Sequence, residues 1–223
     1  MTVMLLDGFW RVVRASPLLR AVGPVLLRGR NYLFDFRHGV HTASSVPLGK
    51  LSVSGNNAAH GIMYDTIDAS LLKDVLHRIP ARLEQFVFVD FGAGKGKALL
   101  IAALFPFRKV IGVEFSEELV NIARANVLSF RGAARACGEI ELAHTDAAQF
   151  TIPGDPAVLY FYNPFREPVM RQVLSNVEQS LQQNPRLLFI VYVNPELADL
   201  IEKMRIFRKI ESGDWHSVYE SVI

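Results

Sequence analysis

A short apolar run, a cluster of glycines and a second apolar run constrain the fold of this chain most strongly. The first run, Phe86 to Val89, has the length and composition of a strand buried on both faces. Asp90 follows, then three alternating glycines, then a helix-like sequence that begins at Lys97. Glycines let the backbone pass close to a ligand, and the first turn of a helix leaves N–H groups unpaired. The pattern therefore predicts a strand, a turn and a helix that bind a nucleotide-like ligand.

Three classes of ligand site use such a turn, and the glycine spacing distinguishes them. The dinucleotide fingerprint G-x-G-x-x-G/A fits Gly92 and Gly94, but its third small residue would fall at Lys97. A P-loop ends in Gly-Lys-Ser/Thr, whereas Gly96-Lys97 is followed by Ala98. The sequence is instead D-x-G-x-G-x-G, and a glycine-rich turn of some other α/β domain stays the alternative. The candidate ligand contacts in this stretch are Asp90, Gly92, Ala93, Gly94 and Gly96.

A second acid stands where α/β nucleotide sites place the carboxylate that accepts hydrogen bonds from ribose hydroxyls. Lys109 to Phe115 is a second apolar strand, and Glu114 comes 20 residues after Gly94. Ser116 is a suitable N-cap for the helix that follows. The two features, at this separation, favour a nucleotide site over an unrelated glycine turn.

The remaining apolar runs complete the pattern of a layered α/β fold. Strands alternating with helices are typical of a parallel sheet covered on both faces. We therefore predict a three-layer, Rossmann-like, seven-stranded and mostly parallel sheet that ends in an antiparallel hairpin. Beyond the two strands above, strands are expected at 139–144, 157–162 and 187–193, helices at about 66–77, 117–130, 167–182 and 196–203, and the hairpin at 205–222.

The sequence divides into an N-terminal helical segment with a lid loop, residues 1–58, and a main domain, residues 59–223. Residues 1–30 read as one or two basic amphipathic helices, which Pro17 and Gly23-Pro24 should break or kink. Such a helix binds a membrane surface, the core or a partner protein, and the sequence favours packing on the core or a partner. Residues 42–57 are rich in Ser, Gly and Asn, and we expect residues 34–65 to form a lid over the ligand.

Composition narrows the class of protein. Half of the residues are hydrophobic, at 50%, but no stretch of about 18 or more is free of charge, so no transmembrane span is expected. The 24 basic and 22 acidic residues give no clear sign of a nucleic-acid partner. Cys137 is the only cysteine, which fits a reducing compartment, and the six histidines lack ligand spacing. We expect a cytoplasmic protein without a metal site, and a membrane-peripheral location stays open.

Residues from about 60 to 222 resemble the class I S-adenosyl-L-methionine (SAM)-dependent methyltransferases, whose motif I has the form D-x-G-x-G-x-G. The resemblance implies SAM as cofactor, with an acid after the third strand near the adenine amine, a position that Asp146 matches. It also implies that the segment before the first strand folds over the cofactor, which makes Tyr64 a candidate contact. The implied cofactor contacts add Tyr64, Glu114, Phe115, Asp146, Ala147 and Asn163 to the glycine turn.

Within this superfamily, the D-x-G-x-G-K-G turn with a tyrosine segment upstream is similar to that of the seven-stranded lysine methyltransferases. These include the histone enzymes named for disrupting telomeric silencing and the small enzymes that modify lysines of mitochondrial carriers and ATP synthase. Phe34 to Thr42 matches the F-D-x-R-x-G-V-x-T segment of similar bacterial proteins. The chain differs at Ala93, where the lysine enzymes usually have Ser, and keeps only part of an Asn/Asp-Pro-Pro-aromatic motif.

The resemblance implies methyl transfer to an amine nitrogen, in a protein lysine or a small amine. Its catalytic candidates follow the fourth strand: Asn163, Pro164 and Phe165. A SAM-binding scaffold without catalysis and an O-methyltransferase of a small molecule stay as alternatives.

Overall fold

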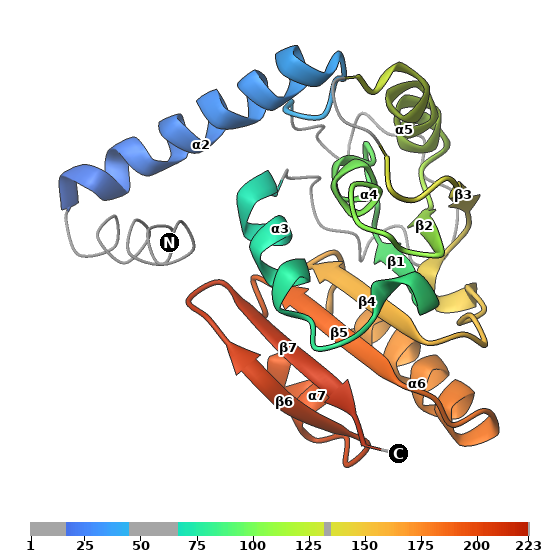
Figure 1. Cartoon of the computed structure of the whole chain (residues 1–223). Coiled ribbons are helices and arrows are strands. Elements are labelled where there is room, and N and C mark those ends of the chain that lie inside the picture. The colour runs from blue at the N-terminus through green and yellow to red at the C-terminus, as the bar shows by residue number, and fades with distance from the viewer. Residues whose placement is uncertain (1–16, 45–66, 132–134, 223) are drawn as a thin grey trace.

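The computed structural model describes residues 17–44, 67–131 and 135–222, which form a seven-stranded sheet with helices on both faces (Figure 1). The strand order is β3-β2-β1-β4-β5-β7-β6. Neighbours from β3 to β5 pair in parallel, and β7 runs antiparallel to both β5 and β6. The predicted fold class is confirmed. The strands are β1 Val87–Phe91, β2 Lys109–Glu114, β3 Ile140–His144, β4 Ala157–Tyr162, β5 Leu188–Val193, β6 Phe207–Ser212 and β7 His216–Ser221.

Helices cover the two faces of the sheet and bury a separate core on each. On the first face lie α3 Ala69–Arg78, α4 Lys97–Ala102 and α5 Glu117–Ser129, and on the second α6 Glu167–Gln183 and α7 Ala198–Glu202. Short 3-10 turns, η3 Leu83–Gln85 and η4 Ala147–Gln149, precede β1 and follow β3.

Alternation along the strands fills both cores. In β1, Phe88 points into the first core, whereas Val89 and Phe91 point into the second. The rings of Phe91 and Phe161, from the paired strands β1 and β4, stack with centroids 4.9 Å apart. Since β1 and β4 are buried on both faces, their sequences read as unbroken apolar runs. The candidate site lies at the carboxyl ends of these buried strands.

The N-terminal helix is not broken at Pro17 or at Gly23-Pro24, where the sequence predicted a break or a kink. Helix α2 runs without interruption from Pro17 to His38. Pro17 occupies its first position, where a missing N–H costs nothing, and the helix continues through Gly23-Pro24. Because Asn31, Phe34 and His38 are buried against the body, the C-terminal half of α2 is fixed, and the hydrogen bond lost at Pro24 does not end the helix.

Helix α3 also begins later than predicted, at Ala69 rather than near Thr66. Its N-cap is Asp68, whose Oδ1 accepts from Ser70 N at 2.8 Å. Of the described helices, none is long and apolar enough to cross a membrane.

Candidate functional site

The glycine turn after β1 is closed by its own backbone. Gly92, Gly94 and Gly96 have φ values of +82°, +54° and +82°, which residues with a side chain rarely adopt. Gly92 N and Ala93 N both donate to Val113 O, at 2.9 and 3.0 Å, and tie the turn to β2. A Cβ atom added to Gly92 would lie 2.6 Å from Cβ of Pro164. The turn after β1 and the turn after β4 are therefore in contact, and only glycine fits between them.

Glu114, at the end of β2, binds the same turn from the other side. Its Oε2 accepts from Gly94 N at 2.8 Å, and its Oε1 accepts from the N–H groups of Phe115 and Ser116, both at 3.0 Å. The side chain is buried, and burial raises the pKa of the carboxyl while the three backbone donors oppose the rise. Because a carboxylate has about four acceptor positions, one stays open for a further donor.

Asp90 places a second acid in this buried region. It lies one residue before the end of β1 and is 3% exposed. Burial, and then the negative charge of Glu114, raise its pKa well above the usual value for an aspartate. Two neighbouring carboxyl groups in a buried site favour a positively charged ligand, because such a ligand offsets both burial and repulsion.

The turn after β4 holds an asparagine in a strained backbone conformation. Asn163 has φ +39° and is buried, and its Oδ1 accepts from Tyr192 Oη at 3.1 Å. Tyr192 Oη also accepts from Leu197 N at 3.3 Å. Burial raises the pKa of Tyr192 to about 12, so its hydroxyl stays protonated and donates at neutral pH. Strand β5 therefore orients Asn163, and this amide keeps a second lone pair on Oδ1.

The other predicted contacts lie at the same edge of the sheet. Phe115 follows β2 and is half-buried. Asp146 follows β3, caps η4 through Ala148 N at 2.9 Å, and precedes the buried Ala147. Since β1 to β4 are parallel, their carboxyl ends bring these groups to one rim. Tyr64 lies outside the described residues.

Sequence reasoning missed the role of the two lysines in the glycine turn. Lys95 Nζ donates to Ser44 O at 2.7 Å and to Ser44 Oγ at 2.6 Å. Lys97 Nζ donates to Asn31 Oδ1 of α2 and lies 4.8 Å from the centroid of the Phe34 ring. Both lysines are buried. Both lysine ammonium groups of the turn therefore bind α2 or the residues just after it, and these contacts attach the N-terminal segment to the glycine turn.

The F-D-x-R-x-G-V-x-T segment, Phe34 to Thr42, forms a defined local structure in this chain. Gly39, at φ +66°, ends α2 in a Schellman motif in which Val40 N donates to Asp35 O at 3.1 Å. The carboxylate of Asp35 accepts from Thr42 N and Oγ1, both at 2.6 Å, and from Ala43 N at 2.7 Å. Residues 34–44 are therefore a helix end and a hydrogen-bonded turn fixed to the body, and not part of a lid; residues 45–65 lie outside the described residues.

Asn126 of α5 joins these parts and was also missed. Its Nδ2 donates to Lys95 O at 2.9 Å, and its Oδ1 accepts from His41 N at 2.8 Å. The residue is 2% exposed. The sequence signal that could have indicated this contact is an asparagine at helical spacing with the apolar residues Leu119 and Ala123, because a polar group on a buried helix face needs a hydrogen-bond partner.

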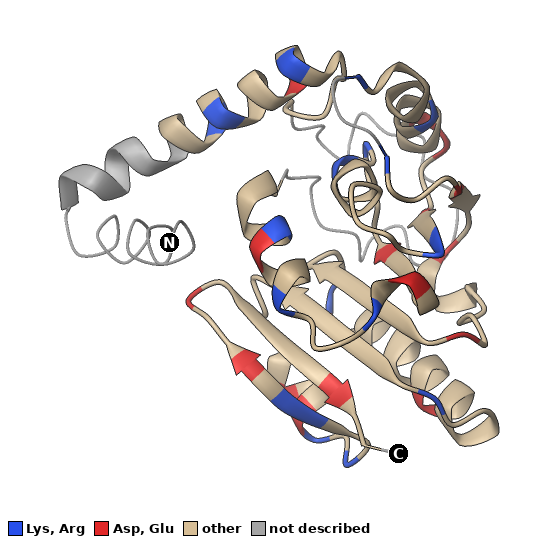
Figure 2. Ribbon diagram, viewed as in Figure 1, with Lys and Arg blue, Asp and Glu red and all other residues tan. Residues whose placement is uncertain are grey.

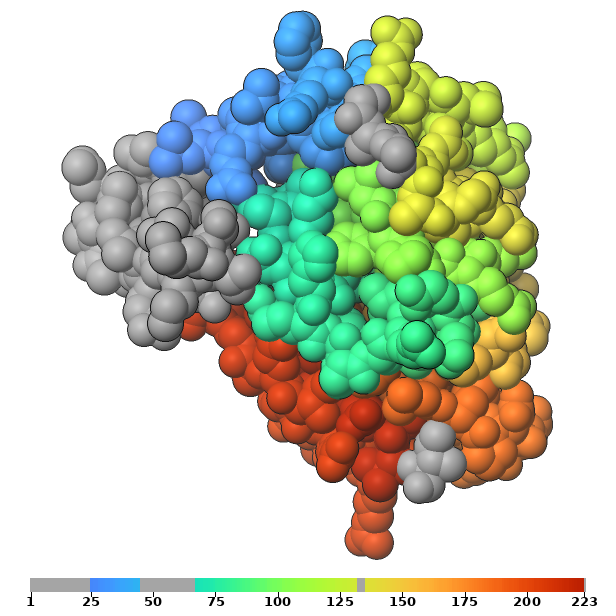
Figure 3. Space-filling model, in the orientation of Figure 1, coloured from blue at the N-terminus to red at the C-terminus, as the bar shows by residue number. Residues whose placement is uncertain are grey.

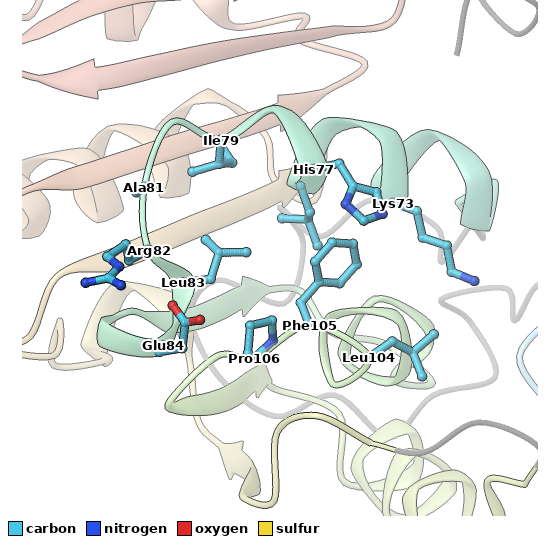
Figure 4. A pocket seen from close by; sticks show the side chains of 11 residues that line it. Lys73, His77, Ile79, Ala81, Arg82, Leu83, Glu84, Leu104, Phe105 and Pro106 are labelled. Carbon is cyan, nitrogen blue, oxygen red and sulfur yellow. The ribbon is translucent and has the colours of Figure 1, made fainter. Parts of the chain in front are cut away.

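A shallow groove of about 600 Å³ lies at the opposite edge of the sheet (Figure 4). It is lined by the end of α3, by η3 and by Leu104 to Pro106, which precede β1 and β2. Lys73, His77 and Arg82 surround it. Open α/β sheets bind ligands at the carboxyl ends of their strands, so this groove is separate from the site at the glycine turn. Within the described ranges, no group of three or more His, Cys, Asp or Glu side chains has the arrangement of a metal site.

Comparison with known proteins gives a fold and no family. No protein-family model and no curated protein matches the chain. A predicted N6-adenine-specific DNA methylase from Listeria monocytogenes has a TM-score of 0.53 and 15% identity over 70% of this chain and 51% of its own. The mitomycin 7-O-methyltransferase MmcR has a TM-score of 0.52 and 14% identity over 70% of this chain and 54% of its own.

A third similar structure covers more of its own length. A protein from Methanococcus maripaludis, assigned as a SAM-dependent methyltransferase, has a TM-score of 0.51 and 14% identity over 69% of this chain and 84% of its own. All three share the Rossmann-like arrangement of strands and helices. The chain thus has the fold of the class I methyltransferases.

Proposed function

We propose that this protein is a SAM-dependent methyltransferase that transfers the methyl group to an amine nitrogen, in a protein lysine or a small amine. The observation that carries the proposal is the contact of Gly92 with Pro164. It joins the turn that we assign to the cofactor with the turn that we assign to methyl transfer. In this fold the two turns end neighbouring parallel strands, β1 and β4.

The chemistry of the turn suits SAM better than a phosphate-bearing nucleotide. The N–H groups of Gly92, Ala93, Gly94 and Gly96 all donate to acceptors within the protein, so these four do not form an anion-binding nest. SAM has no phosphate and carries positive charge on its sulfonium and amino groups. The buried acids Asp90 and Glu114 favour such a ligand.

We assign the open acceptor position of Glu114 to a ribose hydroxyl and Asp146 to the adenine amine, with Phe115 and Ala147 beside them. Bound SAM supplies an electrophilic methyl group. The protein must then hold the acceptor nitrogen with its lone pair in line with that group, since positioning provides much of the catalysis.

Asn163 is the residue that we assign to this positioning. Its Oδ1 accepts one N–H of the acceptor amine while Tyr192 Oη holds the amide from β5. Tyr162, half-buried at the end of β4, supplies aromatic surface that favours a cationic methylated product, whereas Phe165, the other aromatic candidate, is buried in the second core. Only a neutral amine has the lone pair that attacks the methyl group, so a lysine, with an unperturbed pKa of about 10.4, must first release its ammonium proton. Activity should therefore rise toward alkaline pH.

The first experiment identifies the acceptor. The purified chain is incubated with methyl-labelled SAM and cell lysate, and label is followed in protein and in small molecules. Label in lysine or a small amine supports the proposal. Label on oxygen would favour a small-molecule O-methyltransferase, and tight SAM binding without any transfer would favour a non-catalytic scaffold.

The second experiment tests Asn163, and the chain offers a matched control. Asn194 also precedes a proline, has φ +48° and follows a parallel strand, but its side chain bonds Glu196. Both asparagine-to-alanine variants lose a similar backbone preference. We expect Asn163→Ala to lose turnover with SAM affinity retained, and Asn194→Ala to keep turnover. Equal turnover in Asn163→Ala and the wild type would remove Asn163 from the mechanism.

A further inference from the structure

Among residues 25–38 of helix α2, whose side chains the structure describes, one face packs on the described part of the protein and the opposite face is exposed. Asn31, Phe34 and His38 are buried and attach the helix to the glycine turn and to α5. The opposite face is apolar and exposed. Its large side chains and their exposed fractions are Val25 65%, Leu26 43%, Tyr32 58%, Leu33 64% and Phe36 87%.

This exposure is concentrated on α2. Of the eight large hydrophobic residues that are exposed in the described chain, five belong to this helix and three are scattered elsewhere. At 3.6 residues per turn, Val25, Tyr32 and Phe36 share one line along the helix, with Leu26 and Leu33 beside them. The exposed residues form one continuous apolar stripe, which we call the α2 stripe, and single exposed hydrophobic residues would not need a partner.

Arginines border the α2 stripe on both sides. Arg28 follows one edge and Arg37 the other, as the helical spacing requires, and Arg30, on the same side as Arg37, pairs with Asp68 at 3.3 Å. Arg28 and Arg37 are exposed. The only acid of the helix, Asp35, faces the body and accepts three hydrogen bonds from Thr42 and Ala43. In Figure 2, α2 carries blue bands toward its C-terminal end with this single red one. The outer face of the described part of α2 is thus apolar in the middle and positive at its edges.

The stripe is held outward by a rigid attachment. The bonds of Lys97 to Asn31 and of Arg30 to Ser70, the latter at 2.7 Å, fix α2 to α4 and α3. The space-filling view shows α2 along one side of the molecule, at its outer surface (Figure 3). A face so fixed cannot turn its apolar residues inward.

We propose that the α2 stripe binds the surface of an anionic lipid bilayer, with α2 lying in the plane of the interface. An interfacial helix inserts its apolar face at the boundary of headgroups and acyl chains and sets basic residues beside it toward anionic headgroups. Arginine suits the edges because its long stem packs on the apolar surface while the guanidinium reaches the headgroups.

A second copy of the chain fits this surface less well. In a two-fold pairing of two stripes, the arginine edges of one helix meet those of the other, and the helix has no available acid to pair with them. A bilayer of anionic lipids offers negative charge along both edges at once. The charge pattern therefore favours an anionic bilayer over a second copy of the chain.

The test measures partition of the full chain onto phosphatidylcholine vesicles with and without phosphatidylglycerol, by flotation at low salt. The double variant Leu33→Gln/Phe36→Gln removes the centre of the stripe, and Leu128→Gln, at an 85% exposed position in α5, is the matched control. We expect binding only to the anionic vesicles, a partition coefficient lowered at least about tenfold in the double variant, and no change in the control. Arg28→Gln/Arg37→Gln should lower it by about tenfold or more.

Four results would overturn the proposal. The wild type fails to bind anionic vesicles, or the double variant binds as well as the wild type. A dimer in sedimentation equilibrium that the double variant abolishes assigns the stripe to a second copy. If a chain without residues 1–16 binds the vesicles and the full chain does not, the occupant of the α2 stripe is that segment and not a bilayer. All these variants change exposed side chains, and unchanged thermal unfolding shows that they remain folded.

Discussion

Replacing Gly92 by alanine tests the contact between the two turns on which the proposed site rests. Gly92 has φ +82°, and the new Cβ would lie 2.6 Å from Cβ of Pro164, an atom of a rigid ring. The left-handed conformation costs roughly 1–2 kcal/mol for a residue with a side chain. Relief of the overlap costs roughly 1–3 kcal/mol more. The free energy of unfolding should therefore fall by roughly 2–5 kcal/mol.

Urea unfolding measures this loss as a lower midpoint at an unchanged slope. For a chain of this size each kcal/mol corresponds to about 2–4 °C, so the melting temperature should fall by roughly 4–20 °C. Because Pro164 adjoins Asn163, turnover should fall further than stability alone explains, under conditions where the variant is folded.

Gly29→Ala is the matched control. A Cβ at Gly29 meets no atom within 4 Å, and the residue lies inside α2. Alanine is favoured over glycine in a helix by about 1 kcal/mol, so this variant should be slightly more stable than the wild type. A loss below about 1 kcal/mol in Gly92→Ala would refute the reasoning, because the turns after β1 and β4 would then separate without strain.

Two further changes test the buried acids. Glu114→Gln replaces the carboxylate that accepts from Gly94 N by an amide and so removes a negative charge. The binding free energy of SAM, measured by titration calorimetry, should weaken by roughly 1.5–3 kcal/mol. Unaltered affinity would contradict the assignment of Glu114 to the ribose. Asp90→Asn tests the raised pKa of Asp90. Above pH 3.8, the ordinary pKa of an aspartate, the unfolded chain releases the Asp90 proton while the folded protein keeps it. The stability of the wild type relative to the variant should therefore fall as pH rises from 3.8 through the raised pKa of the folded state, and then level off. Parallel curves in urea unfolding across pH would show that Asp90 titrates normally.

The apolar runs of the sequence were enough to predict the sheet. The runs at 157–162 and 187–193 became β4 and β5, because strands buried on both faces must be apolar along their length. The cap at Ser116 is confirmed by the bond from Leu119 N to its Oγ at 3.3 Å. Such features depend on neighbours in the sequence, so a linear pattern records them.

Helix breakers were less reliable. Proline and glycine lower the stability of an isolated helix, so Gly23 and Pro24 predicted a break or a kink in the N-terminal helix. Local propensity is small compared with the packing that fixes α2 through Phe34 and His38, so the packing decided the outcome. The start of α3 at Ala69, where a helix was predicted from about residue 66, is a similar shift of boundary.

The sequence by itself determined the order of strands and helices, the glycine turn and the spacing between Gly94 and Glu114, whose bond at 2.8 Å joins them across two adjacent strands. Only the tertiary structure decided what Lys97 and Asn163 contact. Their partners, Asn31 and Tyr192, stand 66 and 29 residues away along the chain. A single polar residue in a sequence carries its own donors and acceptors but not the identity of the distant group that folding brings within hydrogen-bond distance of it.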